Sequence, residues 1–568
     1  MNAGHAPDVQ VLDVQVLVVG AGPTGLTAAC LLKELGISAL VVDTRAGTTT
    51  RSKALVLQAR TLELFEKIGI ASAAVEQGEP LRWMTPIVRG KPRGRVDISQ
   101  LGAGLTRYPY LLSLEQSRTE ELLHSALQQR GGQVQWNTTL VSFEQDQQGV
   151  TAVLRSGGGA GAGSAAPAAV PTHVRCQYIL AADGAHSTVR HALGIPFEGA
   201  TYQHQFVLAD VAAPGLAQQS LSLFLSWNGF AAFFSMKGSN RARAISMMPG
   251  GSAAAAPAPA AAARTAAGAD ADDQPPFAEV AQAIQHSAGA RVQMEDPRWC
   301  SIYRLHHRAA ARLHQGRAFL LGDAAHIHSP AGGQGMNTGI QDAFNACWKV
   351  AAVLQRDANP ALLETYHAER HPVALALLHG TDRVFSMATS SALPARVLRA
   401  CVLPYVLPVV FRMQGFRRKV FRRVSQIAVR YRHSALSEDV RGCSQVCAGA
   451  RMPWVDTPAG AALSAAQAGL HGLVVMMDPG SGATAAQGVA GLTHQLAAWA
   501  PWLRVHAVQR GAPGAEPLFQ ACGVGEEGAL LLVRPDGYIG FVGTMAQRDA
   551  LRAYLQTWFP TAAGGTAA

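Results

Sequence analysis

Apolar and polar positions near the N-terminus predict strands and helices in alternation. The stretch from Val14 to Val19, apolar at every position except Gln15, predicts a buried strand, an apolar helical run follows Gly25, and residues 39–42 predict a second strand. Two further runs, residues 174–181 and 318–321, also have the pattern of short buried strands and lead into polar, glycine-containing segments. Buried strands that alternate with helices are typical of a parallel sheet, so the pattern predicts an α/β fold.

A different pattern occupies residues 81–111 and 206–248. Residues 81–111 lack a helical period, and residues 206–248 alternate apolar and polar positions, with Phe224, Trp227, Phe230, Phe233 and Phe234 among them. The alternation predicts an antiparallel sheet with one face covered. Two stretches rich in Ala, Gly and Pro, residues 156–167 and 250–276, cannot bury enough side chain to offset their ordering entropy, and we expect loops there.

Helical patterns cover residues 113–130, 339–354 and 362–378, and a stretch of another kind follows at 392–432. This stretch is apolar at first and then strongly basic, and prolines and an arginine interrupt its apolar part. We therefore expect no stable membrane insertion. Packed helices with an arginine-covered outer face are favoured over a helix at a membrane interface, which stays an alternative.

The chain after Gly442 has a pattern of its own. Strand, helix, strand, hairpin and helix follow one another, and Asp536 and Gly537 form the predicted hairpin turn. This order predicts a small separate α/β domain.

Composition adds limits to this picture. The 568 residues are too many for one core, so several domains are expected. The net charge is +10, but many arginines cluster in residues 396–432 and no nucleic-acid motif is present, so attraction for anionic cofactors is favoured over nucleic acid. Of eight cysteines only Cys443 and Cys447 lie close together, at a spacing that fits neither a dithiol redox pair nor a zinc site. Residues 1–13 lack the features of a secretory signal, so a cytoplasmic location is expected.

The first strand leads into a Gly-x-Gly-x-x-Gly motif formed by Gly20, Gly22 and Gly25. In this context Gly20 permits the turn, Gly22 lets a pyrophosphate approach the backbone, and Gly25 lets the helix pack on the strand. Asp43 ends the second strand, where a carboxylate can accept the hydroxyls of an adenosine ribose. The motif therefore predicts a site for an ADP moiety.

Two more glycine and aspartate motifs follow later in the chain. Asp183 and Gly184 come after the strand at 174–181, and the segment 322–337 reads GDAAHIHSPAGGQGMN. Within it, His326 and His328 could suggest a metal, but no third ligand or carboxylate partner is evident, so turn positions are favoured and no metal is expected.

The three motifs, in this order, resemble those of the FAD-dependent aromatic hydroxylases of the p-hydroxybenzoate hydroxylase type. The subgroup with the most similar pattern contains phenol, 3-hydroxyphenylpropionate and polyketide hydroxylases with a thioredoxin-like tail. The resemblance implies a Rossmann-like FAD-binding domain (10–80, 112–195 and 312–345) and an inserted antiparallel β-sheet substrate domain (81–111 and 196–311). A helical segment (346–435) and a thioredoxin-like C-terminal domain without a C-x-x-C motif (440–568) would follow. This tail is expected to be redox-silent, as a cover for the core or a dimerisation module.

The resemblance also implies roles for cofactor-binding residues. The backbone at Gly333–Asn337 would hold the pyrimidine end of the flavin, which suits its chemistry, because a helix N-terminus stabilises the anionic N1 edge of reduced flavin. Lys53 stands where many relatives have an arginine beside the cofactor. The implied set comprises Gly20, Gly22 and Gly25 for the pyrophosphate, Asp43 for the ribose, Lys53 beside the cofactor, Gln116 at the ribityl or isoalloxazine group with Arg118 nearby, Asp183 and Gly184 for FAD and NAD(P)H, Asp323 for the ribityl chain, Pro330 at the flavin edge, and Gly333, Gly335, Met336 and Asn337 for the pyrimidine.

The implied activity is hydroxylation of a phenol or another electron-rich ring. NAD(P)H, with NADPH favoured, would reduce FAD, and O₂ would give a C4a-hydroperoxide that transfers oxygen to a ring held in a site without water. Phenol hydroxylases have an aspartate where this chain has Leu55, so no catalytic base is assigned. We expect the substrate at the sheet of residues 206–248, and a homodimer is an open alternative to a monomer.

Other functions remain open at this point. The same scaffold could support epoxidation or dehydrogenation of a non-phenolic or polyketide substrate, whereas the W-x-W-x-I-P motif of flavin halogenases is absent. Disulfide reductases need an early cysteine pair, and Cys30 is alone there. A catalytically silent flavin-binding scaffold, with the tail as its interaction module, is the alternative from a different class.

Overall fold

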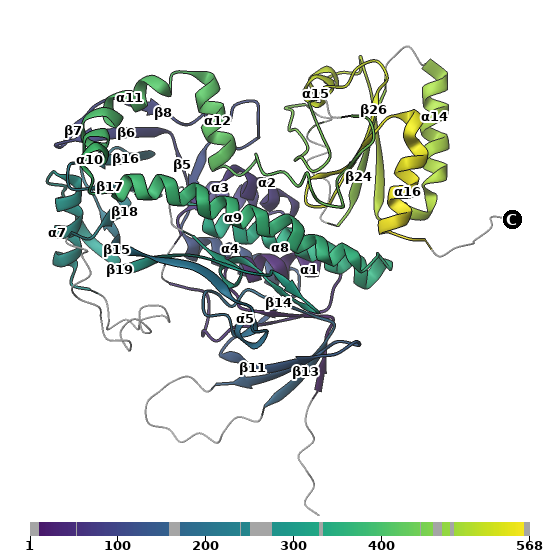
Figure 1. Cartoon of the computed structure of the whole chain (residues 1–568), viewed down its shortest axis with the longest axis horizontal. Coiled ribbons are helices and arrows are strands. Elements are labelled where there is room, and N and C mark those ends of the chain that lie inside the picture. The colour runs from purple at the N-terminus through teal and green to yellow at the C-terminus, as the bar shows by residue number, and fades with distance from the viewer. Residues whose placement is uncertain are drawn as a thin grey trace, which may run out of the picture.

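The computed structural model describes residues 11–50, 52, 54–157, 171–238, 240–249, 275–328, 333–442, 445–457, 460, 469–477 and 482–561. The predicted α/β fold with an inserted antiparallel sheet, a helical segment and a C-terminal α/β domain is confirmed (Figure 1). The limits given for each domain stay predictions.

A six-stranded sheet forms the centre of the N-terminal part. Its order is β10-β3-β2-β14-β21-β20, and all neighbours are parallel except β20 and β21. The buried strand runs of the sequence become β2 (Val16–Val19), β3 (Ala39–Val42), β14 (Tyr178–Ala181) and β21 (Ala318–Leu320), flanked by β10 (Val134–Gln135) and β20 (His314–Gln315).

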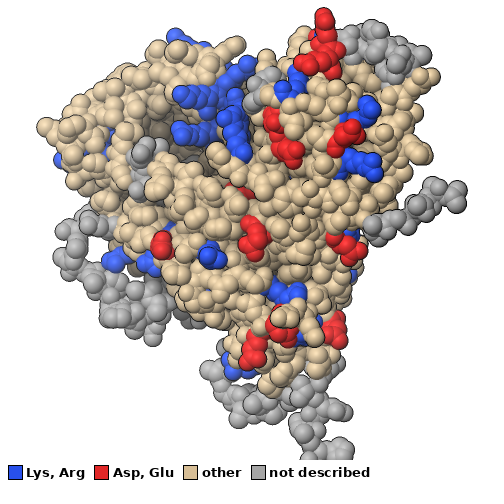
Figure 2. All heavy atoms as spheres, turned by 45° about the vertical axis from the view of Figure 1, so that its right-hand side comes forward, with Lys and Arg blue, Asp and Glu red and all other residues tan. Residues whose placement is uncertain are grey.

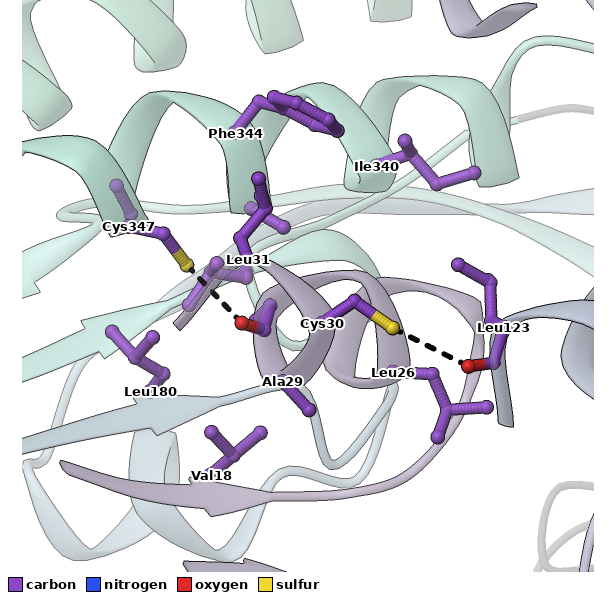
Figure 3. Packing of buried hydrophobic residues seen from close by; sticks show 14 of the residues in the cluster. Val18, Leu26, Ala29, Cys30, Leu31, Leu123, Leu180, Ile340, Phe344 and Cys347 are labelled. Atoms are coloured by element: carbon purple, nitrogen blue, oxygen red, sulfur yellow. Dashed lines mark hydrogen bonds between the residues drawn. The ribbon is translucent and has the colours of Figure 1, made fainter. Parts of the chain in front are cut away.

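Helix α1 (Pro23–Glu34) lies between this sheet and two other helices, α8 (Gly335–Arg356) and α4 (Gln116–Gln129). Figure 3 shows α1 residues such as Leu26 and Leu31 among Val18 and Leu180 of the sheet and Ile340 of α8. The Cys30 thiol donates to the Leu123 carbonyl at 3.3 Å. Because α1 has neighbours on several sides, its residues are apolar nearly all round, as expected for a buried helix. Three shorter helices complete this part: α2 (Ala59–Lys67), α3 (Ala71–Gln77) and α5 (Thr188–Ala192).

Two small sheets flank the central one. The first has the order β1-β13-β12-β11 and the second the order β4-β9-β5. Their strands are β1 (Val11–Asp13), β13 (Thr172–Cys176), β12 (Val150–Ser156), β11 (Thr138–Gln145), β4 (Val56–Leu57), β9 (Leu111–Ser113) and β5 (Glu79–Leu81).

The predicted antiparallel sheet is confirmed and is larger than expected. It has nine strands in the order β22-β19-β15-β18-β17-β16-β6-β7, with β8 paired to β6, and only β16 and β6 are parallel. The strands are β6 (Trp83–Val88), β7 (Lys91–Pro92), β8 (Val96–Asp97), β15 (Phe197–Ala212), β16 (Ser220–Leu225), β17 (Phe230–Ser235), β18 (Arg241–Met247), β19 (Glu295–Ala310) and β22 (His326–Ile327).

Helix α7 (Phe277–Ala288), for which the sequence pattern gave no prediction, covers one face of this sheet. Phe224 and Phe233 pack in the cluster beneath α7. Phe230 and Phe234, which occupy the alternate positions of β17, belong to clusters elsewhere. Side chains of a strand alternate between the two faces, so one face is structural and the other is available to a site.

The helical segment after α8 departs from expectation. It consists of α9 (Ala361–Thr389), which is longer than predicted, then α10 (Leu393–Val397), the π-helix η3 (Leu398–Val402), α11 (Leu403–Val410) and α12 (Gln414–Val424). The predicted helices are present, but the prediction that their apolar side chains pack inside the protein is wrong. Leu393 is 64% exposed, Val409 59% and Met413 63%. By length and composition Leu393–Val410 could cross a membrane, and 11% of it is buried. The sequence pattern could not show this exposure, because burial depends on which other elements pack against a helix.

The C-terminal domain has a five-stranded sheet in the order β23-β27-β26-β24-β25. The predicted strand, helix, strand, hairpin and helix are present, with α15 as an unpredicted addition. The elements are β23 (Glu438–Asp439), β24 (His471–Met477), α14 (Gly482–Gln495), β25 (Leu503–Gln509), α15 (Glu516–Cys522), β26 (Ala529–Val533), β27 (Ile539–Gly543) and α16 (Arg548–Trp558). Cys447, for which the sequence suggested no partner, is disulfide-bonded.

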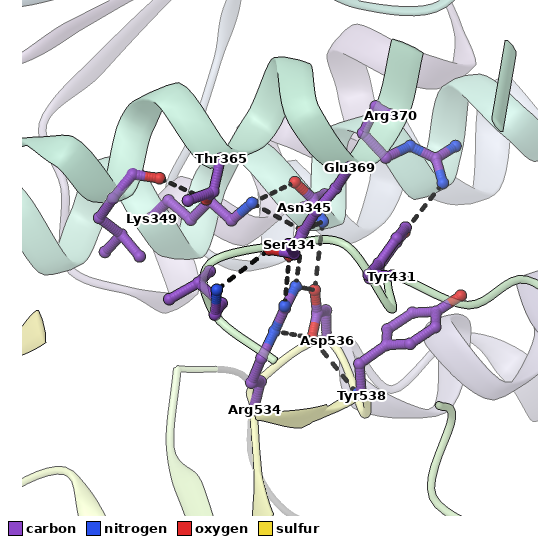
Figure 4. A network of polar contacts seen from close by, with 12 residues as sticks. Asn345, Lys349, Thr365, Glu369, Arg370, Tyr431, Ser434, Arg534, Asp536 and Tyr538 are labelled. Carbon is purple, nitrogen blue, oxygen red and sulfur yellow. Dashed lines mark hydrogen bonds and ion pairs between the residues drawn. The ribbon is translucent and has the colours of Figure 1, made fainter. Parts of the chain in front are cut away.

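The turn between β26 and β27 docks this domain onto the N-terminal part (Figure 4). Arg534 donates to both carboxylate oxygens of Glu369, at 2.6 and 2.9 Å, and Asp536 accepts from Arg534 at 2.6 Å. Lys349 of α8 donates to the same Glu369 carboxylate at 2.8 Å. All four side chains are at most 3% exposed, so the two parts share a buried charged contact.

Candidate cofactor and substrate site

The three sequence motifs meet at one edge of the central sheet. The neighbouring strands β3, β2, β14 and β21 are parallel, so their carboxyl ends lie side by side. In spatial order these ends lead into Asp43, Gly20, Asp183 and Asp323. Ligands of open α/β sheets bind at this edge.

Close backbone contacts join the motifs. A Cβ on Gly20 would lie 2.3 Å from the carbonyl oxygen of Ala182, and a Cβ on Gly25 would lie 1.8 Å from the carbonyl oxygen of Gly20. Thr24, inside the first motif, lies so near the third that its Oγ1 would be 2.7 Å from a Cβ on Gly322 and 2.3 Å from one on Gly339. Segments some 300 residues apart are therefore packed at van der Waals contact, which only glycine permits.

Gly22 differs from its neighbours, since a Cβ there would meet nothing within 4 Å. It is the N-cap residue of α1, and no side chain caps that helix. The first N–H groups of α1 therefore face open space, as an anion site at a helix N-terminus requires. The first motif fits a diphosphate.

The Asp43 carboxylate lies at this edge of the sheet, and it already accepts hydrogen bonds from neighbouring residues. Its Oδ2 accepts from the Ala21 N–H at 2.6 Å, and the Arg45 guanidinium donates to Oδ1 and Oδ2, both at 3.1 Å. The Arg45 N–H adds a fourth bond at 2.8 Å. Because a carboxylate offers about four acceptor positions, a ribose here would have to displace part of the Arg45 contact.

Glu120 is a site residue for which the sequence suggested no role, and Arg45 lies beside it in the loop after Asp43. Arg45 also pairs with buried Glu120 at 3.1 Å and lies over the Trp136 ring, 5.9 Å from its centroid. Glu120 in turn accepts from the Gln116 amide at 3.0 Å. Gln116 and Glu120 are spaced i, i+4 on one helix, and this spacing could have identified Glu120 from the sequence.

The second motif brings a buried carboxylate to the same edge. Asp183 accepts from the Val189 N–H at 3.3 Å, and its Oδ1 is buried without a hydrogen-bond partner among the described residues. Burial raises the pKa of Asp183, although hydrogen bonds from Ser187 and the Val189 N–H oppose this effect. Gly184 has a φ of +79°, which favours glycine.

The third motif forms the start of α8. This helix begins at Gly335, four residues before the predicted start, so Gly335, Met336 and Asn337 are its first turn rather than a loop before it. Its N-cap, Gln334, makes no capping side-chain bond, so this side chain leaves the first N–H groups to other acceptors. Asp323 is exposed in the short 3₁₀ helix η2 (Gly322–Ala324).

Asn337 fixes the glycine turn that precedes α8. Its amide donates to the carbonyls of Val56 and Gly333, both at 2.8 Å. Its oxygen accepts from the Gln58 N–H at 2.8 Å and the Thr61 hydroxyl at 2.6 Å. Fully buried Asn337 therefore acts through its side chain to hold β4 against the turn, in addition to the backbone role expected from the sequence.

Gln116 and Arg118 lie in different surroundings. The Gln116 oxygen accepts from the Ala54 N–H at 3.2 Å, which places this side chain at the loop before β4. Arg118 is exposed and pairs with Glu121 at 2.8 Å. The structure therefore brings Gln116, but not Arg118, into the hydrogen-bonded interior of the site.

A buried ion pair connects the nine-stranded sheet to this loop. Arg243 of β18 donates to both oxygens of Asp210 at 2.6 Å and to the Ala54 carbonyl at 3.0 Å. Arg243 is fully buried. Asp210 and Arg243 lie directly opposite each other on β15 and β18. An acidic and a basic residue within otherwise apolar strands are the signal that could have identified them from the sequence.

His326 has a carboxylate partner, which corrects the expectation that none exists. Its Nε2 lies 2.7 Å from Oδ2 of Asp342, and Arg370 donates to the other oxygen of Asp342 at 2.6 Å. Burial opposes ionisation, but Arg370 and His326 lower the pKa of Asp342. No group of three potential metal ligands occurs among the described residues. The histidine therefore ties the third motif to α8 and α9.

An apolar cluster lies between the turn before α8 and the nine-stranded sheet. It contains Leu55, Val56 and Met236, with Phe234 packed against it. A Cβ on Gly333 would lie 3.1 Å from the Val56 Cβ, so the cluster touches the third motif. Tyr303, whose pKa burial raises, packs with Phe206 and Phe230 on the same sheet. Lys53 and Pro330, two of the expected site residues, lie outside the described residues.

The comparisons with known proteins agree with this geometry. A model described as "FAD binding domain" matches residues 13–381, and one described as "Aromatic-ring hydroxylase, C-terminal" matches residues 445–562. The chain is similar to 6-methylpretetramide 4-monooxygenase of Streptomyces rimosus, with 32% identity over 95% of this chain and 93% of that protein. Pentachlorophenol 4-monooxygenase of Sphingobium chlorophenolicum is 33% identical over 66% of this chain and 64% of its own.

Among solved structures, the anhydrotetracycline hydroxylase OxyS from Streptomyces rimosus has a TM-score of 0.71 at 28% identity, over 97% of this chain and 99% of its own. The likeness in sequence and in fold thus extends over both the nucleotide-binding part and the C-terminal domain. This chain belongs to the FAD-dependent aromatic-ring hydroxylases.

Proposed function

We propose that this FAD-dependent aromatic monooxygenase uses NAD(P)H and O₂ to hydroxylate a phenolic ring of a multi-ring, polyketide-type compound. The assignment of the cofactor site rests on one observation, namely that the three motifs contact one another around Gly20 and Thr24. The choice of a multi-ring substrate is supported by the relative that matches nearly the full chain, which is named for a compound of that kind, whereas the pentachlorophenol enzyme matches a shorter part.

The residues present fit FAD. The open space over Gly22 and the uncapped start of α1 would hold its diphosphate, and Asp43 with Arg45 its adenosine ribose. The uncapped start of α8, at Gly335–Asn337, would donate N–H groups to the pyrimidine edge, with Gly333 in the turn before it. We also assign Lys53, Gln116, Asp183, Gly184, Asp323 and Pro330 to this site, and Arg118 to its exposed side.

When bound, FAD supplies electron transfer from a nicotinamide and oxygen transfer to the ring. The chain supplies binding, orientation and exclusion of water. Leu55, Val56, Met236 and Phe234 form the apolar wall nearest the third motif. The raised pKa of Tyr303 keeps its phenol protonated, so it can donate a hydrogen bond but does not act as a base. We therefore assign no catalytic base.

Anaerobic stopped-flow reduction of the bound flavin tests this proposal. NADPH and NADH are compared, each with and without single-ring and multi-ring phenols. A separate aerobic reaction under ¹⁸O₂ then identifies the product. We expect a multi-ring phenol to speed flavin reduction and to gain one labelled oxygen atom. If only single-ring phenols speed flavin reduction, the substrate is a single-ring phenol and not a multi-ring compound. Flavin that NAD(P)H does not reduce under any condition would favour a silent scaffold.

A cytoplasmic location forms part of the proposal. Cys30, Cys176, Cys300, Cys347, Cys401 and Cys522 are free thiols, as is usual in a reducing compartment. The disulfide at Cys447 is the one observation against it.

A further inference from the structure

We propose that the exposed face of α10, η3 and α11, together with the basic residues beside it, binds the surface of an anionic phospholipid bilayer. The contact is peripheral, and it is separate from the proposed reaction.

The first observation is the concentration of exposed apolar side chains. Seven of the twelve exposed large hydrophobic residues of the described chain lie between residues 393 and 413. We call them the apolar surface: Leu393, Val397, Val402, Tyr405, Val406, Val409 and Met413. Single exposed apolar residues are normal, but a contiguous group of this kind marks an interaction site.

The second observation is that this segment is fixed flat on the molecule. Arg399, only 4% exposed, donates to the carbonyls of Ser226 at 3.1 Å and Ala388 at 2.7 Å. Arg396 donates to the Trp227 carbonyl at 3.1 Å. These bonds tie the inner side of the segment to the end of α9 and to the turn between β16 and β17. Lifting the segment into a bilayer as a span would break them, so it presents one side only, as an interfacial helix does.

The third observation is an excess of positive charge around the apolar surface. Residues 393–432 contain ten Lys and Arg residues and no Asp or Glu. Six of them belong to α12 or precede it directly, and none forms an ion pair with a described residue: Arg412, Arg417, Arg418, Lys419, Arg422 and Arg423. Figure 2 shows blue side chains gathered in the upper part of the molecule, beside a hollow and a tan surface.

The hairpin of β6 and β7 extends the basic region on the other side of α11. Arg89 and Lys91 are exposed in it, and it is packed on α11, since the Arg93 guanidinium lies 5.7 Å from the Tyr405 ring centroid. In Figure 1 these elements lie together at the upper left, opposite the C-terminal domain. The apolar surface is thus bordered by cations from two parts of the sequence.

Charge decides between a bilayer and a second copy of the chain. A symmetric dimer through this surface would bring two sets of unpaired cations together, which costs free energy. Nucleic acid would pair with the cations but leave the apolar surface without a partner. An anionic bilayer satisfies both, because headgroups attract Lys and Arg while acyl chains accept the apolar residues.

Vesicle flotation with the FAD-loaded full chain tests the proposal. Vesicles of phosphatidylcholine alone are compared with vesicles that also contain phosphatidylglycerol. We expect binding to the anionic vesicles only. The double variants Val406→Asp/Val409→Asp and Arg418→Glu/Arg422→Glu should each weaken it by about tenfold or more.

Two matched controls lie on other elements. Val141→Asp changes an exposed valine of β11, and Arg548→Glu/Arg552→Glu reverses an exposed arginine pair of α16 with the same spacing. Both should bind as the unchanged protein does. FAD content and the thermal transition of every variant show that it is folded, and the comparison of the two vesicle types needs no variant.

Three results would overturn the proposal. The unchanged protein could fail to bind anionic vesicles. The Val406→Asp/Val409→Asp variant could bind as well as the unchanged protein, which would reduce the effect to general charge attraction. Sedimentation could reveal a dimer that the same variant dissociates while vesicles are not bound, and the surface would then be an interface between copies.

Discussion

The glycines of the first motif have different physical roles, although the sequence presents them as one pattern. Gly25 and Gly20 are needed by the protein itself, because a Cβ at either would overlap a backbone carbonyl. Gly22 has open space and ordinary backbone angles, φ −74° and ψ −176°. Its lack of a side chain therefore serves the ligand and not the fold.

This difference predicts opposite results for two small substitutions. Gly22→Ala should change the free energy of unfolding of the FAD-free protein by less than about 0.5 kcal/mol. It should weaken FAD binding by about tenfold or more, because a methyl group would enter the diphosphate site. Gly25→Ala should lower the free energy of unfolding by about 3 kcal/mol or more. Urea unfolding and flavin titration measure both. Equal loss of stability in the two variants would contradict the assignment.

At the scale of single elements, β17 divides its aromatic residues between two faces. Phe233, 1% exposed, packs beneath α7, and its neighbour Phe234 packs against the apolar cluster beside the third motif. The alternation was visible in the sequence, but the choice of face was not. Only the position of α7 identifies the structural face.

We therefore expect different effects of the same truncation at neighbouring positions. Phe233→Ala should lower the free energy of unfolding by about 3–5 kcal/mol, as truncation of a core phenylalanine does. Phe234→Ala should lower the free energy of unfolding by about 1 kcal/mol. It should also raise, by about tenfold, the concentration of phenol needed to speed flavin reduction. If Phe234→Ala leaves this concentration unchanged, the apolar cluster does not contact the substrate.

For the whole molecule, the contact between the N-terminal part and the C-terminal domain is charged and buried. Burial opposes ionisation of Glu369, yet Arg534 and Lys349 hold its pKa well below its usual value. Arg60 of α2 also donates to the Asp536 carbonyl. The Trp348 indole of α8 donates to the Asp536 carboxylate at 3.3 Å, so this domain contacts the helix whose start we assign to the flavin.

Removing one member of that network should be costly. Arg534→Ala leaves the Glu369 carboxylate with fewer partners in a buried place, and we expect the free energy of unfolding to fall by about 3–5 kcal/mol. The matched control is Arg175→Ala, which breaks the exposed pair with Asp146 and should lower the free energy of unfolding far less, because solvent screens that pair. Urea unfolding distinguishes the two. Similar small losses would show that the network does not join the domains.

A histidine at the same contact should make stability depend on pH. His471 packs against Trp348, Trp502 and Phe559, and burial lowers its pKa well below the usual value. Below about pH 6.5 the unfolded chain then binds a proton that the folded chain does not, so stability falls with falling pH by up to about 1.4 kcal/mol per pH unit. His471→Phe should therefore reduce the loss of stability between pH 7.5 and 5.5 by about 1.4 kcal/mol.

The control is Trp502→Phe, which changes a ring packed against His471 but removes no titratable group, and it should leave this pH dependence as it is. Glu369 and Asp342, whose pKa values are lowered, contribute stability that is lost only at more acidic pH. An unchanged pH profile in His471→Phe would mean that this histidine is not held neutral.

The sequence by itself determined the central sheet, the order of the motifs and the family. A strand, a glycine turn and a helix are specified by neighbouring residues, and parallel strands bring their ends to one edge whatever the rest of the chain does. The same local rules identified Gly20, Gly22, Gly25 and Asp43 as site candidates. The family resemblance added the start of α8, with an error of four residues in where that helix begins.

Tertiary structure alone decided the contacts between distant segments. The partners of Asp43, Asn337 and His326, the Arg243–Asp210 pair and the docking of Asp536 depend on which elements pack together. The same holds for the apolar surface of α10–α11, which the pattern had assigned to a packed interior. Hydrophobic periodicity shows which side of a helix avoids water, but the neighbouring elements decide whether the protein itself covers that side.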